Sequence, residues 1–115
     1  MGILDPAALE NLREMVGGDT EFVSDLIDTF LDQAPQMLAD MHQGLASGDV
    51  VLLRRAAHSL KSNSAEFGAR DLHALCQEIE TMCKTGVPVD AELIARVEDE
   101  FAKVKTALTA VQQQL

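Results

Sequence analysis

The chain has 115 residues, 47% of them hydrophobic and 24% charged, which predicts one globular domain over 1–115 with a continuous core. Its formal net charge of −10 disfavours nucleic acid and anionic membrane surfaces as partners, because both are bound through clustered Lys and Arg. The longest aliphatic run, Val50–Leu53, is far shorter than the roughly 20 residues that span a bilayer. No charged-then-apolar leader opens the chain. We therefore expect a cytoplasmic protein without membrane insertion.

The first two helices are predicted from capping residues and from proline positions. Asp5 followed by Pro6 is typical of an N-cap and first helical position, and predicts a short helix that ends near Val16. Asp19 caps the next helix, in which Pro35 predicts a kink rather than a break. Apolar residues recur along this helix at spacings of three and four, namely Phe22, Leu26, Ile27, Phe30, Leu31, Ala34, Leu38, Met41 and Leu45.

Three more helices follow in chain order. The segment 47–49 ends the long helix and caps a third, expected over 50–67, with Gly68 as its C-terminal stop. A fourth is expected over about 69–84, and Asp90 caps a fifth. Their apolar residues are Leu72, Leu75, Cys76, Ile79, Met82, Cys83, Leu93, Val97, Phe101, Val104, Leu108 and Val111. The pattern predicts an all-α fold, an antiparallel four-helix bundle with a short additional N-terminal helix.

The two cysteines, Cys76 and Cys83, are seven residues apart on one face of the fourth helix. Their backbone separation is about 10 Å at 1.5 Å per residue, too far for a disulfide. We expect buried thiols in a reducing cytosol.

The third helix carries a histidine on its exposed face. At 100° per residue, His58 lies about 140° from the direction of the core-facing side chains, so we expect its imidazole to face water. The small residues Ser62 and Ala65 leave space for another protein to approach the ring. Lys61 lies within reach of any anion that the ring carries. The core-facing residues are Leu53, Ala57, Leu60, Ser64 and Phe67.

These surroundings favour phosphorylation of the imidazole, although a lone exposed histidine more often has no function. Neutral imidazole is a covalent nucleophile, and imidazole is mostly neutral at cytosolic pH. A phosphorylated ring carries close to two negative charges, with which Lys61 can pair. Arg55 and Val51 add a cation and an apolar side chain to the same exposed face, which we interpret as a contact surface for a partner.

The segment from His58 to Ala69, HSLKSNSAEFGA, resembles the signature of histidine-containing phosphotransfer (HPt) domains, H-x-L-K-G-[SA]-[SA]-x-x-[LFIV]-G-A. The resemblance extends to the number and order of the helices. It implies a four-helix bundle, without an ATP site, that shuttles a phosphoryl group between receiver-domain aspartates in a two-component phosphorelay. It also implies that His58 is the phosphoacceptor and that Lys61 assists the phosphoryl oxygens. Glu80 falls where family members place a Gln or Glu that accepts a bond from the ring N–H and orients the ring.

One position departs from the family pattern. Ser62 stands where the signature has glycine, at the point where a receiver comes closest, so docking is expected to persist with an altered rate or choice of partner. The implied partners are receiver domains of response regulators, with a hybrid sensor histidine kinase as a further candidate. In the family the receiver brings the Mg²⁺, so no cofactor is expected in this chain, which is either free-standing or part of a larger sensor kinase.

Other functions have weaker support in the sequence. His42 and His73 are lone histidines, and His73 with Cys76 falls short of the three or four ligands of a metal site, so no metal is expected. Gly17-Gly18 lacks the Lys-Ser/Thr of a nucleotide phosphate loop. The Asp and Glu residues are expected on solvent faces.

The alternative from another class is a non-catalytic helical adaptor or oligomerisation bundle with the same fold. The first segment leaves a second choice open, because its apolar residues either help form the docking surface beside His58 or cap the bundle. These residues are Ile3, Leu4, Leu9 and Leu12.

Overall fold

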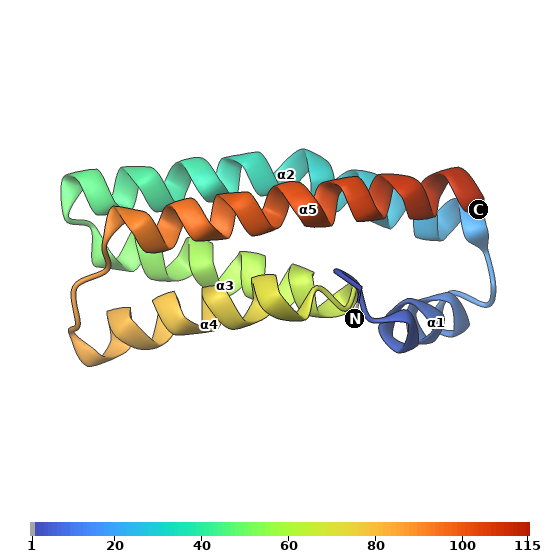
Figure 1. The fold of residues 1–115 in the computed structure, drawn as a ribbon, viewed down its shortest axis with the longest axis horizontal. Helices are drawn as coiled ribbons and strands as arrows, with labels where there is room; N and C mark the ends of the chain where they lie inside the picture. The colour runs from blue at the N-terminus through green and yellow to red at the C-terminus, as the bar shows by residue number, and fades with distance from the viewer. Residues whose placement is uncertain (1) are drawn as a thin grey trace.

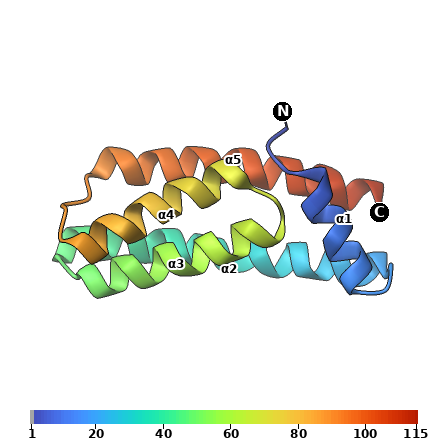
Figure 2. The same cartoon turned by 90° about the horizontal axis from the view of Figure 1, so that it is seen from below.

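The computed structural model describes residues 2–115 of the chain. These residues contain five α-helices joined by short turns. They are α1 (Pro6–Met15), α2 (Thr20–Ser47), α3 (Val50–Glu66), α4 (Arg70–Thr85) and α5 (Ala91–Gln114). Helices α2 to α5 run antiparallel in sequence and form a bundle, and α1 lies at the end where α2 begins and α5 finishes (Figure 1; Figure 2). The described residues contain no strand. The all-α bundle with a short N-terminal helix is thus confirmed, with boundaries within about one residue of those predicted.

Aspartate side chains cap the N-termini of most of the helices. Oδ1 of Asp49 accepts a hydrogen bond from the backbone N–H of Leu52 at 3.0 Å and so caps α3. The same role is filled in α1, α2 and α5 by Asp5, Asp19 and Asp90. Within the described residues, α4 has no side-chain cap, and the chain enters it through Gly68, whose φ of 70° suits glycine. This tight turn returns α4 alongside α3.

The core between the helices is mainly aliphatic, with three phenylalanine rings in contact. The Phe30 ring stacks on Phe67 with centroids 5.3 Å apart, and meets Phe101 edge-on at 5.9 Å. The residues of the third helical segment that are predicted to face the core are all buried, namely Leu53, Ala57, Leu60, Ser64 and, as the C-cap of α3, Phe67. The opposite face of α3 therefore lies toward solvent, as the helical periodicity predicts.

Three positions are more exposed or more buried than the sequence suggests. Phe22 is 50% exposed, because the buried face of the first turns of α2 runs through Val23 and Ile27 instead. Cys83 is half-buried rather than buried, while Cys76 is fully buried and both thiols are free. Burial raises the pKa of the Cys76 thiol to about 12. Glu100 is buried, against the expectation that carboxylates lie on solvent faces.

The helix α2 continues through Pro35 without a break, in agreement with the sequence. Its length of 28 residues, with the 24 of α5, exceeds that of α3 and α4. The kink at Pro35 stays a prediction.

The N-terminal segment packs against the end of the bundle. Leu12 is buried, and Ile3, Leu4 and Leu9 are partly buried against the core, which favours the capping role over the docking role. The backbone N–H of Asp5 donates to the carbonyl of Gly68 at 2.9 Å, and the Asp5 carboxylate forms an ion pair with Arg70. The start of α1 is thereby fixed to the turn between α3 and α4.

None of the helices in residues 2–115 is both long enough and apolar enough to cross a membrane.

Candidate functional site

His58 lies near the middle of α3 with 59% of its side chain exposed. Its Nδ1 is 2.7 Å from Oε2 of Glu80 on α4. An ionised carboxylate only accepts hydrogen bonds, so Nδ1 carries the proton and donates it to Glu80. In the neutral ring Nε2 then holds a lone pair, and Nε2 has no hydrogen-bond partner among residues 2–115. The ring is therefore fixed through one nitrogen and open at the other.

Glu80 is a buried carboxylate, with 3% of its side chain exposed and a partner for each oxygen. Oε1 accepts a hydrogen bond from the ammonium group of Lys61, and Oε2 accepts the one from His58. The Lys61 hydrogen bond holds the pKa of Glu80 below its usual range, and outweighs burial, which acts to raise that pKa. The bond from His58 lowers the pKa further. Glu80 is thus ionised at neutral pH.

Lys61 lies one turn after His58, yet its ammonium group points to α4 rather than to solvent. Besides Glu80 it donates to Oε1 of Gln77 at 3.1 Å, and its side chain is 17% exposed. The sequence predicts Lys61 as the partner of an anion on the ring, whereas in the structure its charge is already paired with Glu80. The two helices are also linked by His73, whose Nδ1 lies 3.2 Å from the carbonyl oxygen of Lys61.

A shallow depression of about 420 Å³ lies beside the imidazole on the side toward the start of α3. It is lined by Arg54, Arg55, His58, Ser59, Glu80 and Lys84. With Lys61, four of the nine Lys and Arg residues of this acidic chain are therefore gathered around His58. The ring stands in a locally cationic region.

The remaining residues predicted for the site lie on the exposed face of α3 without contacting Glu80. Ser62, Ala65, Arg55 and Val51 are all exposed. The structure thus brings His58, Lys61 and Glu80 into direct contact, and leaves these four as a solvent-facing surface that extends on both sides of the ring.

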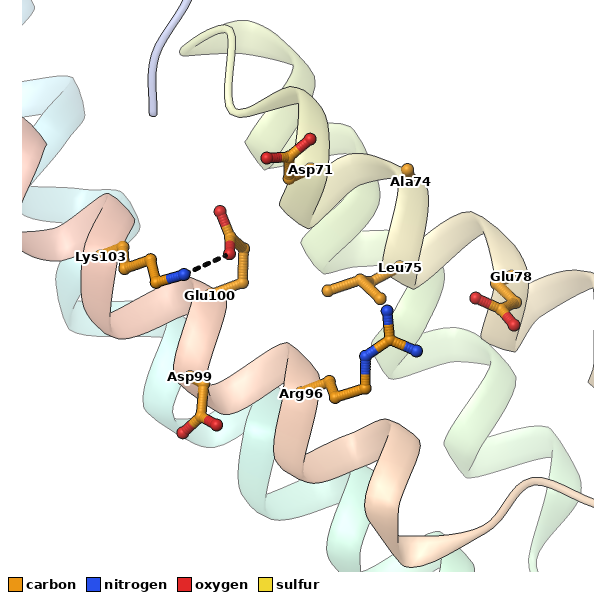
Figure 3. A pocket seen from close by; sticks show the side chains of 8 residues that line it. All are labelled: Asp71, Ala74, Leu75, Glu78, Arg96, Asp99, Glu100 and Lys103. Atoms are coloured by element: carbon orange, nitrogen blue, oxygen red, sulfur yellow. Dashed lines mark ion pairs between the residues drawn. The ribbon is translucent and has the colours of Figure 1, made fainter. Parts of the chain in front are cut away.

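A second groove, of about 500 Å³, lies between α4 and α5 (Figure 3). Leu75 and the Arg96 guanidinium lie close together in it, and Glu100 forms an ion pair with Lys103 at 3.5 Å (Figure 3). Although several carboxylates line this groove, no three His, Cys, Asp or Glu side chains within residues 2–115 are arranged to hold a metal ion. Nε2 of His42, on α2, lies 2.9 Å from Oε1 of Glu98 on α5.

A bundle of antiparallel helices that presents a half-exposed imidazole, held by a buried carboxylate, defines the class of histidine phosphotransfer modules. The sequence model described as the Hpt domain matches residues 25–114, and the chain belongs to this family. Its function is histidine phosphotransfer in two-component phosphorelays. Modules of this family have no ATP site of their own.

Individual relatives agree with this assignment. The chain is 32% identical over 90 residues to the phosphorelay protein LuxU of Vibrio vulnificus (strain YJ016), covering 78% of this chain and 76% of LuxU. It is similar to the crystal structure of histidine-containing phosphotransfer protein B (HptB) from Pseudomonas aeruginosa PAO1, with a TM-score of 0.88, 32% identity and coverage of 98% and 96% of the two chains. The HPT domain of a sensor hybrid histidine kinase from Shewanella shares the fold, with a TM-score of 0.78, 24% identity and the same coverage.

Three residues of the site were missed in the sequence, namely Arg54 and Lys84 beside the ring and Gln77 beside Lys61. Gln77 and Lys84 lie three residues before and four after Glu80, so helical spacing places them on the same side of α4. Their nearness to Lys61 and His58, respectively, was not readable, because it depends on which turn of α4 meets which turn of α3.

Proposed function

We propose that His58 is the phosphoacceptor and that residues 1–115 act as one HPt domain, a transfer intermediate rather than an enzyme. The observation that carries the proposal is the 2.7 Å contact between Nδ1 of His58 and a buried, ionised Glu80, on a ring that is mostly exposed. It directs the lone pair of Nε2 away from the carboxylate and toward a visiting donor.

The transfer uses a covalent phosphohistidine. Nε2 of His58 attacks the phosphorus of a receiver's aspartyl phosphate, the new N–P bond forms, and the P–O bond to the aspartyl carboxylate breaks. The carboxylate leaves with the bonding electron pair. The Nδ1 proton remains on the ring and donates to Glu80, whose negative charge stabilises the positive charge that the ring gains. The reverse attack by a second receiver's aspartate regenerates neutral His58.

The partners that we propose are receiver domains of response regulators, with a hybrid sensor histidine kinase as a further candidate, all in the cytosol. We assign Ser62, Ala65, Arg55 and Val51 to the docking surface, because they are exposed around the ring. The short side chain of Ser62 leaves room for a receiver where the family signature has glycine. We assign Lys61 an indirect role in phosphoryl stabilisation through Glu80. The chain contributes no cofactor, and the Mg²⁺ of the reaction belongs to the receiver.

Phosphotransfer from a receiver loaded with labelled phosphate tests the proposal. We expect acid-labile, base-stable label on the wild-type chain and none on His58→Gln. The variant should stay folded but lose about 1–3 kcal/mol of its free energy of unfolding, because the buried Glu80 carboxylate loses the hydrogen bond from Nδ1. Circular dichroism checks its helical content.

His42→Gln is the matched control, since His42 is also an exposed histidine with a carboxylate partner, and it should keep the label. Label that persists on His58→Gln would contradict the assignment of the phosphoacceptor. A wild-type chain that no receiver labels would favour the adaptor alternative.

A further inference from the structure

We infer that Arg54 and Lys84, rather than Lys61, hold the phosphoryl oxygens when His58 is phosphorylated. The inference deepens the proposed function and rests on His58 being the phosphoacceptor. Arg55, which also lines the depression, stays with the proposed docking surface. The other three cations form two groups, one that maintains the buried carboxylate and one that binds the phosphoryl anion.

Lys61 belongs to the first group because its ammonium is already committed. It contacts Glu80 and Gln77, and it is the least exposed of the cations whose ion pairs reach Glu80. Moving Lys61 to a phosphoryl group would remove the main partner of a buried charge, which is unfavourable. It would also leave the Glu80 carboxylate, which fixes the ring, without its ammonium partner. The free energy of the site therefore favours Lys61 staying on Glu80.

Arg54 and Lys84 belong to the second group because they line the depression that opens beside the ring. Arg54 has no carboxylate partner among the described residues. Lys84 lies 3.9 Å from Oε2 of Glu80, the same oxygen that accepts from His58, and its side chain is 58% exposed. One cation comes from α3 and the other from α4, so together they flank the imidazole.

The chemistry of a phosphoryl group fits this arrangement. A phosphohistidine carries close to two negative charges on three oxygens, and Arg and Lys are the side chains that bind such oxygens. Glu80 also lines the depression, but its two oxygens are held by Lys61 and by Nδ1 of His58, the ring nitrogen that does not carry the phosphoryl group. Lys84 is exposed and Arg54 is half-buried, and each should change phosphoryl binding by about two- to five-fold, the range of a solvent-accessible ion pair.

The test uses phosphoramidate as a small anionic donor, so that docking of a receiver plays no part. Nε2 displaces ammonia from phosphorus as the P–N bond of the donor breaks and the new N–P bond forms. We expect Arg54→Ala and Lys84→Ala each to slow labelling of His58 and to shorten the phosphohistidine lifetime by about two- to five-fold. The lifetime shortens because cations hold the dianion more strongly than a loose, metaphosphate-like transition state.

Three controls separate charge from structure. Lys105→Ala removes one exposed cation from α5 and should behave as the wild type. Arg54→Lys should restore most of the lifetime. High salt should reduce the difference between Lys84→Ala and the wild type, because Lys84 is 58% exposed and salt screens exposed charges. The ³¹P resonance of the phosphohistidine should titrate at higher pH in Arg54→Ala than in the wild type.

The outcomes distinguish this inference from the function on which it rests. A wild-type chain that phosphoramidate labels at no histidine contradicts the phosphoacceptor assignment itself. Labelling of His58 with equal lifetimes in the wild type, Arg54→Ala and Lys84→Ala overturns the inference alone. A lifetime that responds only to Lys61→Ala would overturn it as well, and would return the phosphoryl-binding role to Lys61.

Discussion

A buried carboxylate is destabilising unless both of its oxygens have partners, and in Glu80 the partners are the two groups to which we assign roles in transfer. Oε1 accepts from Lys61 and Oε2 from His58. The same residue therefore stabilises the contact between α3 and α4 and orients the imidazole. At the scale of single residues, stability and reactivity are linked through one side chain.

We expect Glu80→Gln to make the free energy of unfolding less dependent on pH in the acid range. The pKa of Glu80 is lowered in the folded state, so its ionised form adds stability that is fully present above the ordinary value of 4.5. That stability is lost as the pH falls through the lowered folded value. The variant should be less stable than the wild type near neutral pH by about 1–3 kcal/mol, and the difference should shrink on acidification. Urea denaturation at a series of pH values measures this.

Glu78→Gln is the control on the same helix, because Glu78 is exposed, and its stability should differ from the wild type by less than about 0.5 kcal/mol. Parallel pH curves for wild type and Glu80→Gln would show that Glu80 takes up its proton equally in the folded and unfolded states, against the ion pair described here.

At the scale of elements, the turn between α3 and α4 sets the position of the site. Gly68 adopts a φ of 70° there, and its carbonyl accepts a hydrogen bond from Asp5 at the start of α1. The turn thus places Glu80 opposite His58 and also anchors the N-terminal helix. A glycine is required on two grounds, the left-handed backbone and the close approach of α1.

We expect Gly68→Ala to destabilise the protein by about 2–4 kcal/mol, from left-handed strain together with overpacking. A Cβ at this position would lie 2.8 Å from the backbone nitrogen of Asp5 and 2.9 Å from Cβ of Ala8. The start of α1 must therefore move. Urea denaturation gives the loss of stability, and hydrogen exchange should show faster exchange of α1 amides relative to α3.

Gly86→Ala separates the two causes. Gly86 has a φ of 76° with no atom within 4 Å of an added Cβ, so the substitution introduces strain alone, about 1 kcal/mol. Equal losses of stability in Gly68→Ala and Gly86→Ala, with unchanged hydrogen exchange of the α1 amides, would mean that the contact between Gly68 and α1 contributes nothing to stability.

At the scale of the whole molecule, the core and the site lie on opposite sides of α3. The core is built from residues of all four long helices, and the largest fully buried side chains are spread among them. The site uses only the solvent-facing side of α3 and one side of α4. Substitutions in the core should therefore affect folding before they affect transfer.

We expect Ile94→Ala, a fully buried position on α5, to lower the free energy of unfolding by about 2–5 kcal/mol through loss of burial and the cavity that remains. Labelling of His58 should be unchanged wherever the variant is folded. Denaturation followed by circular dichroism, with phosphoramidate labelling of the same samples, measures both. Leu115→Ala, at the exposed C-terminus, should be neutral in both assays. Loss of labelling in folded Ile94→Ala would show that the site depends on distant packing.

The sequence by itself determined the helices and the outward direction of His58. Caps such as Asp49 and the apolar repeat of α3 are local signals, because they depend on residues within one or two turns. The resemblance of the segment that begins at His58 to a family signature added the predicted chemistry. These predictions agree with the fold because helical periodicity fixes which side of a helix is buried.

Only the tertiary structure decided which side chains meet across the helices. Periodicity gives the face of a helix but not the height at which a neighbouring helix packs against it, so the pairing of Lys61 with Glu80 and Gln77 was not readable. The exposure of Phe22 and the burial of Glu100 also depend on packing between helices, since Phe22 lies beside the buried positions Val23 and Ile27 of α2, and Glu100 lines the groove between α4 and α5. The direction of a side chain is a local property of its helix, whereas its partner is set by the packing of the whole bundle.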